Sequence, residues 1–162
     1  MKALSIWQPW ASAIALGHKR VETRSWSTPY RGPLLIHAAR TPASGLQVIR
    51  EMPELWREVL PVADGQTLEQ VFRALPFGAI VAQVDLVGVV RADHRDELRQ
   101  AAVRAGGKYS HLEPDLGDYS QGRFAWFFAN VRAFPEPLAI KAGQLGLFDV
   151  ELPNDKPAAA QP

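Results

Sequence analysis

The feature that most constrains the fold is a long, nearly uninterrupted apolar run from Gly78 to Ala92. Its valines and isoleucines are typical of a β-strand. A second run, Phe124 to Phe134, alternates large aromatic residues with other apolar residues, so both of its faces are expected to be buried. Two such strands predict that the chain is organised around a sheet.

The rest of the chain alternates shorter strands with helical segments. Pro9 and Gly17 are suited to begin and end a short helix. Amphipathic spacing, as in Leu68 to Leu75, predicts a helical insertion over about 41–76. The mixed charges of Asp93 to Ala105 predict an exposed helix. Further strands are expected at 3–6, 21–26, 33–38, 138–140 and 147–150, with a turn at Pro135–Pro137 and a disordered tail at 153–162.

The stretch Gly17 to Trp26 concentrates polar chemistry in ten residues, G-H-K-R-V-E-T-R-S-W. As a strand, its second half places Glu22, Arg24 and Trp26 on one face, and Lys19 in the preceding turn can reach Glu22. An arginine held by a carboxylate can still donate to a phosphate or a base edge. The alternative is an ordinary solvated ion pair, which contributes little to stability.

Trp7 and Trp10 flank Gln8-Pro9 and form a possible stacking platform. A base stacked on an aromatic side chain contributes ~1–3 kcal/mol. The alternative is that both indoles anchor the core. We expect one indole to be buried and the other to reach the cleft. Trp10, which lies inside the predicted helix, is the expected core residue.

Composition narrows the class of protein. The chain has 162 residues, which is typical of one domain, and a net charge of +1 from 18 basic and 17 acidic residues. A protein that coats nucleic acid non-specifically is usually far more basic, so any such contact is expected to be local. The lack of cysteine excludes disulfides and thiol chemistry and fits a cytoplasmic protein. No apolar run approaches the length of a membrane span, and we predict no metal and no cofactor.

The pattern G-x-K-x-x-E-x-R, formed by Gly17, Lys19, Glu22 and Arg24, resembles the signature of the ASCH domain family. The resemblance is dense over 1–40, thinner over 78–92, and resumes over 122–150. The segments that carry it are Ser5–Ala11, Tyr30–Ala39, Arg123–Arg132 and Gly146–Val150.

The resemblance implies an α+β fold, a PUA-like mixed β-barrel with peripheral helices, over a single domain 1–152. It also implies a basic and aromatic cleft that binds RNA, single-stranded nucleic acid or a modified nucleoside. The residues expected to bind the ligand are Lys19, Glu22, Arg24, Trp7, Trp26, Tyr30, Arg31, His37 and Arg40.

Some small proteins that resemble this chain are amidohydrolases that act on acylated cytidine, and others are associated with RNA cleavage. The second hypothesis is therefore a metal-independent hydrolase in which Lys19 and Glu22 are catalytic. The amidohydrolase branch has a threonine where this chain has Glu22, and no nucleophile is evident in the sequence. Binding is therefore ranked first.

Asp85 lies inside the long apolar run and needs a partner there. It either caps a loop or faces the pocket and meets Lys19 or Arg24.

The polar stretch 106–122 predicts a long loop, which in a compact domain is often functional. Either it is a lid lined by Lys108, Tyr109, His111, Tyr119 and Ser120, or it is a mobile surface loop.

Gln144 to Phe148, Q-L-G-L-F, resembles the peptide by which bacterial proteins dock on the sliding clamp. Similar segments occur in the last strand of the family, so a structural role is favoured. The clamp hypothesis fails if these residues pack in the barrel.

Overall fold

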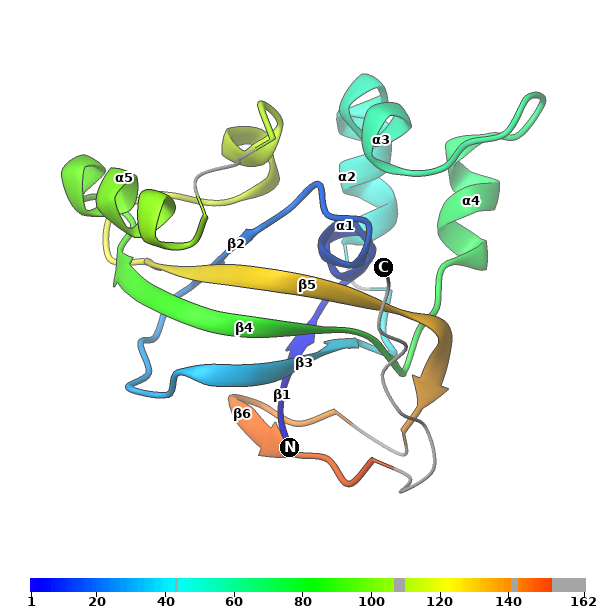
Figure 1. Ribbon diagram of the computed structural model, residues 1–162. Coiled ribbons are helices and arrows are strands. Elements are labelled where there is room, and N and C mark those ends of the chain that lie inside the picture. The colour runs from blue at the N-terminus through cyan, green and yellow to red at the C-terminus, as the bar shows by residue number, and fades with distance from the viewer. Residues whose placement is uncertain (43, 107–109, 141–142, 153–162) are drawn as a thin grey trace.

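A six-stranded mixed sheet forms the centre of the computed structural model, which describes residues 1–42, 44–106, 110–140 and 143–152 (Figure 1). The strand order is β2-β5-β4-β3-β1-β6. β1 and β3 are parallel, and the other neighbours are antiparallel. The strands are β1 Lys2–Ile6, β2 Val21–Arg24, β3 Gly32–Ala38, β4 Ala79–Arg91, β5 Phe124–Ala139 and β6 Leu147–Asp149.

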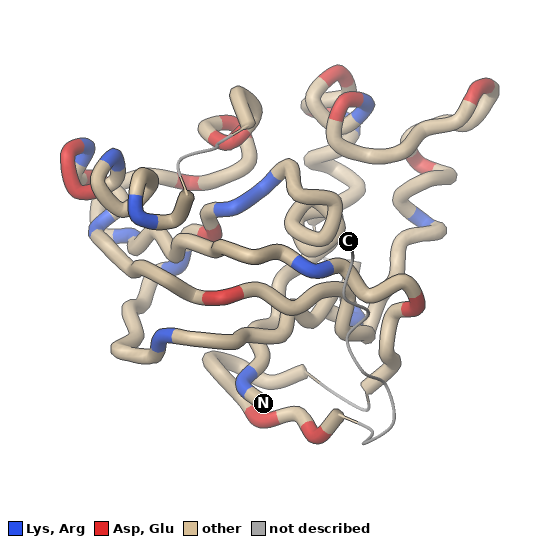
Figure 2. Tube along the Cα trace, in the orientation of Figure 1, with Lys and Arg blue, Asp and Glu red and all other residues tan. Residues whose placement is uncertain are grey.

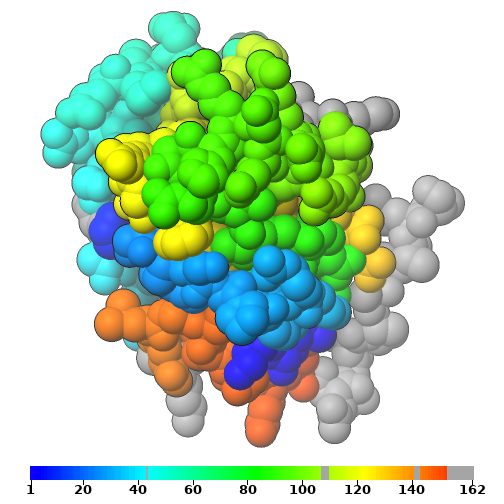
Figure 3. All heavy atoms as spheres, turned by 90° about the vertical axis from the view of Figure 1, so that its left-hand side faces the viewer, coloured from blue at the N-terminus to red at the C-terminus, as the bar shows by residue number. Residues whose placement is uncertain are grey.

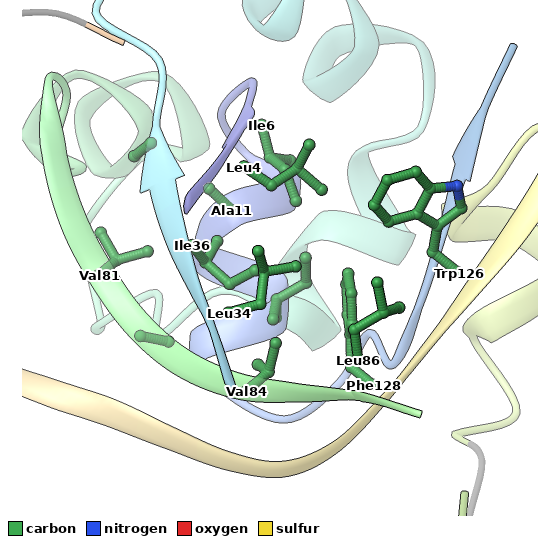
Figure 4. Close-up of a cluster of buried hydrophobic side chains, with 13 residues drawn as sticks. Leu4, Ile6, Ala11, Leu34, Ile36, Val81, Val84, Leu86, Trp126 and Phe128 are labelled. Atoms are coloured by element: carbon green, nitrogen blue, oxygen red, sulfur yellow. The ribbon is translucent and has the colours of Figure 1, made fainter. Parts of the chain in front are cut away.

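The sheet curls into a half-barrel around an apolar core, as Figure 4 shows for β4. Alternate residues of β1, β3 and β4 point inward, and Trp126 and Phe128 of β5 complete the cluster. The curl arises because β4 and β5 pair with several register shifts, and bulges of this kind bend a ribbon.

Helices cover the concave side and one end of the sheet. α1 (Trp10–Ala15) contacts β3, β4 and β5. α2 (Gly45–Glu51), α3 (Pro53–Val59) and α4 (Leu68–Ala74) occupy the predicted insertion between β3 and β4 and share a second apolar cluster. α5 (Arg95–Arg104) packs on β4 and β5, and Figure 3 shows it in green above the β2–β3 turn in blue. A short 3-10 helix, η1 (Glu113–Leu116), follows.

The predicted turn at Pro135–Pro137 is wrong, because β5 continues through it to Ala139. Proline cannot donate to a sheet ladder, which is why these residues suggested a break. The register shifts there: Ala133 pairs with Ala82, and Leu138 pairs with Ile80. The prolines lie within this irregularity, where the ladder does not need their donors.

Asp85 does not face a pocket. Its carboxylate accepts a hydrogen bond of 2.8 Å from the side-chain amide of Asn130 on the neighbouring strand. Asn130 lies beside a register shift and has a φ of 49°, which asparagine tolerates better than most residues. The pocket alternative for Asp85 is therefore wrong.

The C-terminal Gly-Leu-Phe segment has a structural role. Leu147 and Phe148 belong to β6, which pairs with β1, and Phe148 is buried against Ala3 and Leu35. The clamp hypothesis fails by the criterion set for it. The predicted tail 153–162 lies outside the described residues.

Within the described residues, no helix combines the length and the apolar character needed to cross a bilayer.

Gly45 provides a test of how the insertion docks on the connection between β1 and α1. A Cβ at Gly45 would lie 2.2 Å from the carbonyl oxygen of Gln8, which is backbone and cannot swing aside. We expect Gly45→Ala to lower the free energy of unfolding by about 1–3 kcal/mol in urea denaturation. Gly88→Ala is the control, because its nearest neighbour would be 3.8 Å away. Equal stability of the two variants would contradict this docking.

Candidate functional site

The candidate site is a cleft of about 350 Å³ at the mouth of the half-barrel, between β2 and the helical insertion. Four segments line it: Ile6, Trp7 and Trp10 from the β1–α1 connection; Glu22, Thr23 and Arg24 from β2; Val48, Met52 and Trp56 from the insertion; and Asp115–Asp118 with Arg123.

Lys19 lies directly beneath this cleft and is wholly buried. Its ammonium donates to the backbone carbonyl of Val21 and, over 2.7 Å, to that of Leu116. The same Nζ lies 3.6 Å from Glu22 Oε2. Two neutral acceptors and one carboxylate therefore surround the charge, which satisfies a group that would otherwise be very costly to bury.

Glu22 lies between two cations, as the strand pattern predicts. Arg24 Nε is 3.6 Å from Glu22 Oε1, opposite the contact to Lys19. The Glu22 side chain is only 12% exposed, whereas that of Arg24 is 26% exposed and reaches the cleft.

Arg24 also closes the open side of the half-barrel. Its Nη2 donates to the backbone carbonyl of Ser5 in β1, although β1 and β2 are not neighbours in the sheet.

Three buried donors around the cleft lack an aligned hydrogen-bond acceptor among the described residues: Arg24 Nε, Trp56 Nε1 and Arg123 Nε. Native structures seldom leave buried donors unpaired. All three residues line the cleft, but these nitrogen atoms themselves are not accessible from it, and Arg24 Nε and Arg123 Nε face the carboxylates of Glu22 and Asp118.

Glu113 was missed by the sequence reasoning, which placed it in a generic loop. Its carboxylate oxygens accept from the backbone amides of Arg20, at 2.7 Å, and Val21, at 3.0 Å. Burial raises the pKa of the Glu113 carboxyl, while Lys19 and the two amides act in the opposite direction. Glu113 differs from other loop carboxylates only in its position beside β2, and the sequence does not reveal that position.

Arg123 and Asp118 were missed as well. Arg123 donates to the carbonyl of Thr23 over 2.9 Å, and its Nε lies 3.2 Å from Asp118 Oδ2. The amide of Asp118 donates to Thr23 Oγ1. Of the predicted lid residues, Lys108 and Tyr109 lie outside the described residues.

The lining is of mixed charge rather than basic. Two arginines and three carboxylates, Glu22, Asp115 and Asp118, face the cleft within the described part of the chain. Figure 2 shows the same interspersion of acidic and basic residues along the described part of the trace.

The two indoles differ in exposure in the expected sense, but both line the cleft. Trp7 is 54% exposed at the rim of the cleft. Trp10 is half-buried and packs edge-on against Trp56, with ring centroids 5.9 Å apart.

Six of the predicted ligand-binding residues do not line this cleft: Lys19 lies buried beneath it, and the other five lie elsewhere. Trp26 is half-buried and packs edge-on against the core residue Trp126. Tyr30 and Arg31 donate to carbonyls within their own turn. His37 is buried beside Ser5, and Arg40 donates to the carbonyl of Ile140. Their proposed contact with a ligand is not supported by this geometry.

His37 has an environment that makes stability depend on pH. Burial, and then the charge of Arg40, lowers its pKa from the ordinary value of 6.5. Its Nδ1 lies 2.9 Å from Ser5 Oγ.

The unfolded chain therefore takes up a proton at His37 more readily than the folded chain does. This contribution to stability is present above about pH 6.5 and is lost as the pH falls below that value, by at most about 1.4 kcal/mol per pH unit. We expect His37→Asn to lose less stability than the wild type between pH 7.5 and 5 in urea titrations. His18→Gln is the control, and a slope unchanged by His37→Asn would refute this assignment.

The buried ammonium gives a matched pair of lysine variants. Lys19→Met leaves the carbonyls of Val21 and Leu116 without their donor, and we expect a loss of about 3 kcal/mol in the free energy of unfolding. Lys2→Met removes an exposed ion pair with Asp149, and we expect a loss of less than about 1 kcal/mol. Similar losses in chemical denaturation would show that Lys19 is not held as described.

Comparison with known proteins places the chain in a family. A family model described as "ASCH domain" matches residues 4–138. Two curated relatives are named activating signal cointegrator 1: the human protein is 40% identical over 139 residues, and the mouse protein is 31% identical over 138 residues. Each alignment covers 85% of this chain but only 20% of the relative. The chain thus spans about a fifth of these proteins.

Solved structures agree in fold. A crystal structure of ASCH from Zymomonas mobilis has a TM-score of 0.50 at 15% identity, covering 93% of this chain and 87% of that one. A point mutant of the same protein gives a TM-score of 0.50 at 16% identity, covering 93% and 89%. The α+β, PUA-like fold is therefore confirmed. With a family model matched over most of its length, the chain belongs to the ASCH domain family.

Proposed function

We propose that this ASCH domain binds RNA, single-stranded nucleic acid or a modified nucleoside in the cleft between β2 and the insertion. The observation that carries the proposal is an exposed Trp7 at the rim of a cleft that the partly exposed side chains of Arg24 and Arg123 also line. An indole can stack on a base, and arginine donors fit base carbonyls or phosphate oxygens.

The mixed charge of the lining favours a base over a phosphate as the group that enters the cleft. A base edge presents both donors and acceptors. Arg24 and Arg123 can serve its acceptors, while Glu22 and Asp118 can accept from its N–H groups. The proposal treats residues 1–152 as a single domain and the protein as cytoplasmic, which its lack of cysteine supports.

The geometry gives less support to a hydrolase. Lys19 is wholly buried, and its ammonium already donates to two carbonyls beside Glu22. A general base must reach the proton that it removes. Binding without turnover is therefore the function that we infer.

The test is titration of wild type and Trp7→Ala with a single-stranded RNA oligonucleotide and with N4-acetylcytidine. Loss of the stacking ring is expected to weaken binding by about 1–3 kcal/mol, or roughly 5- to 150-fold. Trp7→Phe is expected to retain most of the affinity. Leu145→Ala, at another exposed apolar residue, is the control.

If wild type binds neither probe, the proposed function is wrong. Turnover of N4-acetylcytidine that is lost in Glu22→Gln would instead establish the hydrolase.

A further inference from the structure

The outer edge of β2 is where the segment 113–123 meets the sheet. β2 stands at the end of the strand order and pairs only with β5 among the described strands. Its other edge carries backbone groups that no strand satisfies. Side chains, rather than a seventh strand, form hydrogen bonds with these backbone groups.

Glu113 provides acceptors at the start of this edge. Both of its carboxylate oxygens are used, one by the amide of Arg20 and one by the amide of Val21. The residue is 4% exposed, so water does not compete for these bonds. Glu113 is not among the residues that line the cleft.

Lys19 makes the opposite contact, because here the donor lies on the β2 side and the acceptor lies in the loop. Its ammonium donates to the carbonyl of Leu116 while also donating to that of Val21. The two segments are therefore joined by charged groups in both directions. Hydrogen bonds with one ionised partner are stronger than neutral ones.

The contacts continue along β2 to the cleft itself. Thr23 accepts from the amide of Asp118 through its hydroxyl and from Arg123 through its carbonyl. Asp118 and Arg123, which line the cleft, are thus placed in register with β2. On the far side, Leu112 and Leu116 pack in the same cluster as Trp56 of the insertion.

We propose that Lys19 and Glu113 are a positioning pair that fixes residues 113–118 as a rigid wall of the cleft. The pair holds Asp118 and Arg123 where a ligand meets them, and touches no ligand itself. This stretch is then a built wall rather than a lid that opens. The inference rests on the proposed function only for the identity of the ligand. The docking of the wall on β2 can be measured without a ligand.

The test is hydrogen–deuterium exchange of the full chain, followed by mass spectrometry, in wild type and Glu113→Gln. The amide side chain keeps one acceptor oxygen but turns an NH₂ group toward the second backbone amide. We expect exchange in peptides covering 113–123 to accelerate about tenfold, with central β4 peptides nearly unchanged. Glu54→Gln, at an exposed position on α3, is the matched control and should change neither.

A second measurement is affinity for the RNA oligonucleotide and N4-acetylcytidine, which should fall about tenfold in Glu113→Gln with its fold retained. If Glu113→Gln does not fold, Thr23→Val, which removes only the acceptor of the Asp118 amide, should accelerate exchange around Asp118 and not in β4.

Equal acceleration in the wall and in β4 would show a role in global stability only and would overturn the inference. Unchanged exchange in the wall would overturn it as well. If wild type binds neither probe, the exchange result still decides the role of the pair, and only the proposed function fails.

Discussion

One buried ammonium group links most of what is distinctive in this domain. Lys19 has no contact with solvent, yet it joins the turn after α1, the first residue of β2 and the end of η1. Burying such a charge is tolerable only if its donors are satisfied. The surrounding backbone must therefore hold two carbonyls and a carboxylate in place, and this requirement couples the loop 113–118 to β2.

The same requirement explains why Lys19, Glu22 and Arg24 occur together in this chain. The lysine needs Glu22 as a counter-charge, and Glu22 in turn orients Arg24 at the mouth of the cleft. Only Arg24 of the three is substantially exposed. In this chain the three residues are thus mainly an internal support, with only Arg24 exposed at the cleft.

Local pattern was enough to predict most of the elements and the Lys19–Glu22–Arg24 cluster, because strand alternation and short sequence separation determine both. Contacts between distant segments were not predictable in this way. Glu113 meets Arg20 across 93 residues, and nothing in its neighbours marks it. Trp26 follows the end of β2, so strand alternation no longer governs it and its half-buried ring packs against Trp126 of the core. His37 and Ser5 meet on the other side of the sheet from Leu4 and Ile36, since successive residues of a strand face opposite ways.

The covering of β2 has a consequence for behaviour at high concentration. An open strand edge is a template on which another polypeptide can add by backbone pairing, the usual start of aggregation and of strand exchange. Here the outer edge of β2 is occupied by the side chains of Glu113, Lys19 and Arg123, and the strand at the other border, β6, is only three residues long. The β2 and β6 borders therefore present little continuous backbone for self-association, whereas the part of β5 beyond Phe127 has no strand partner on its β2 side among the described residues.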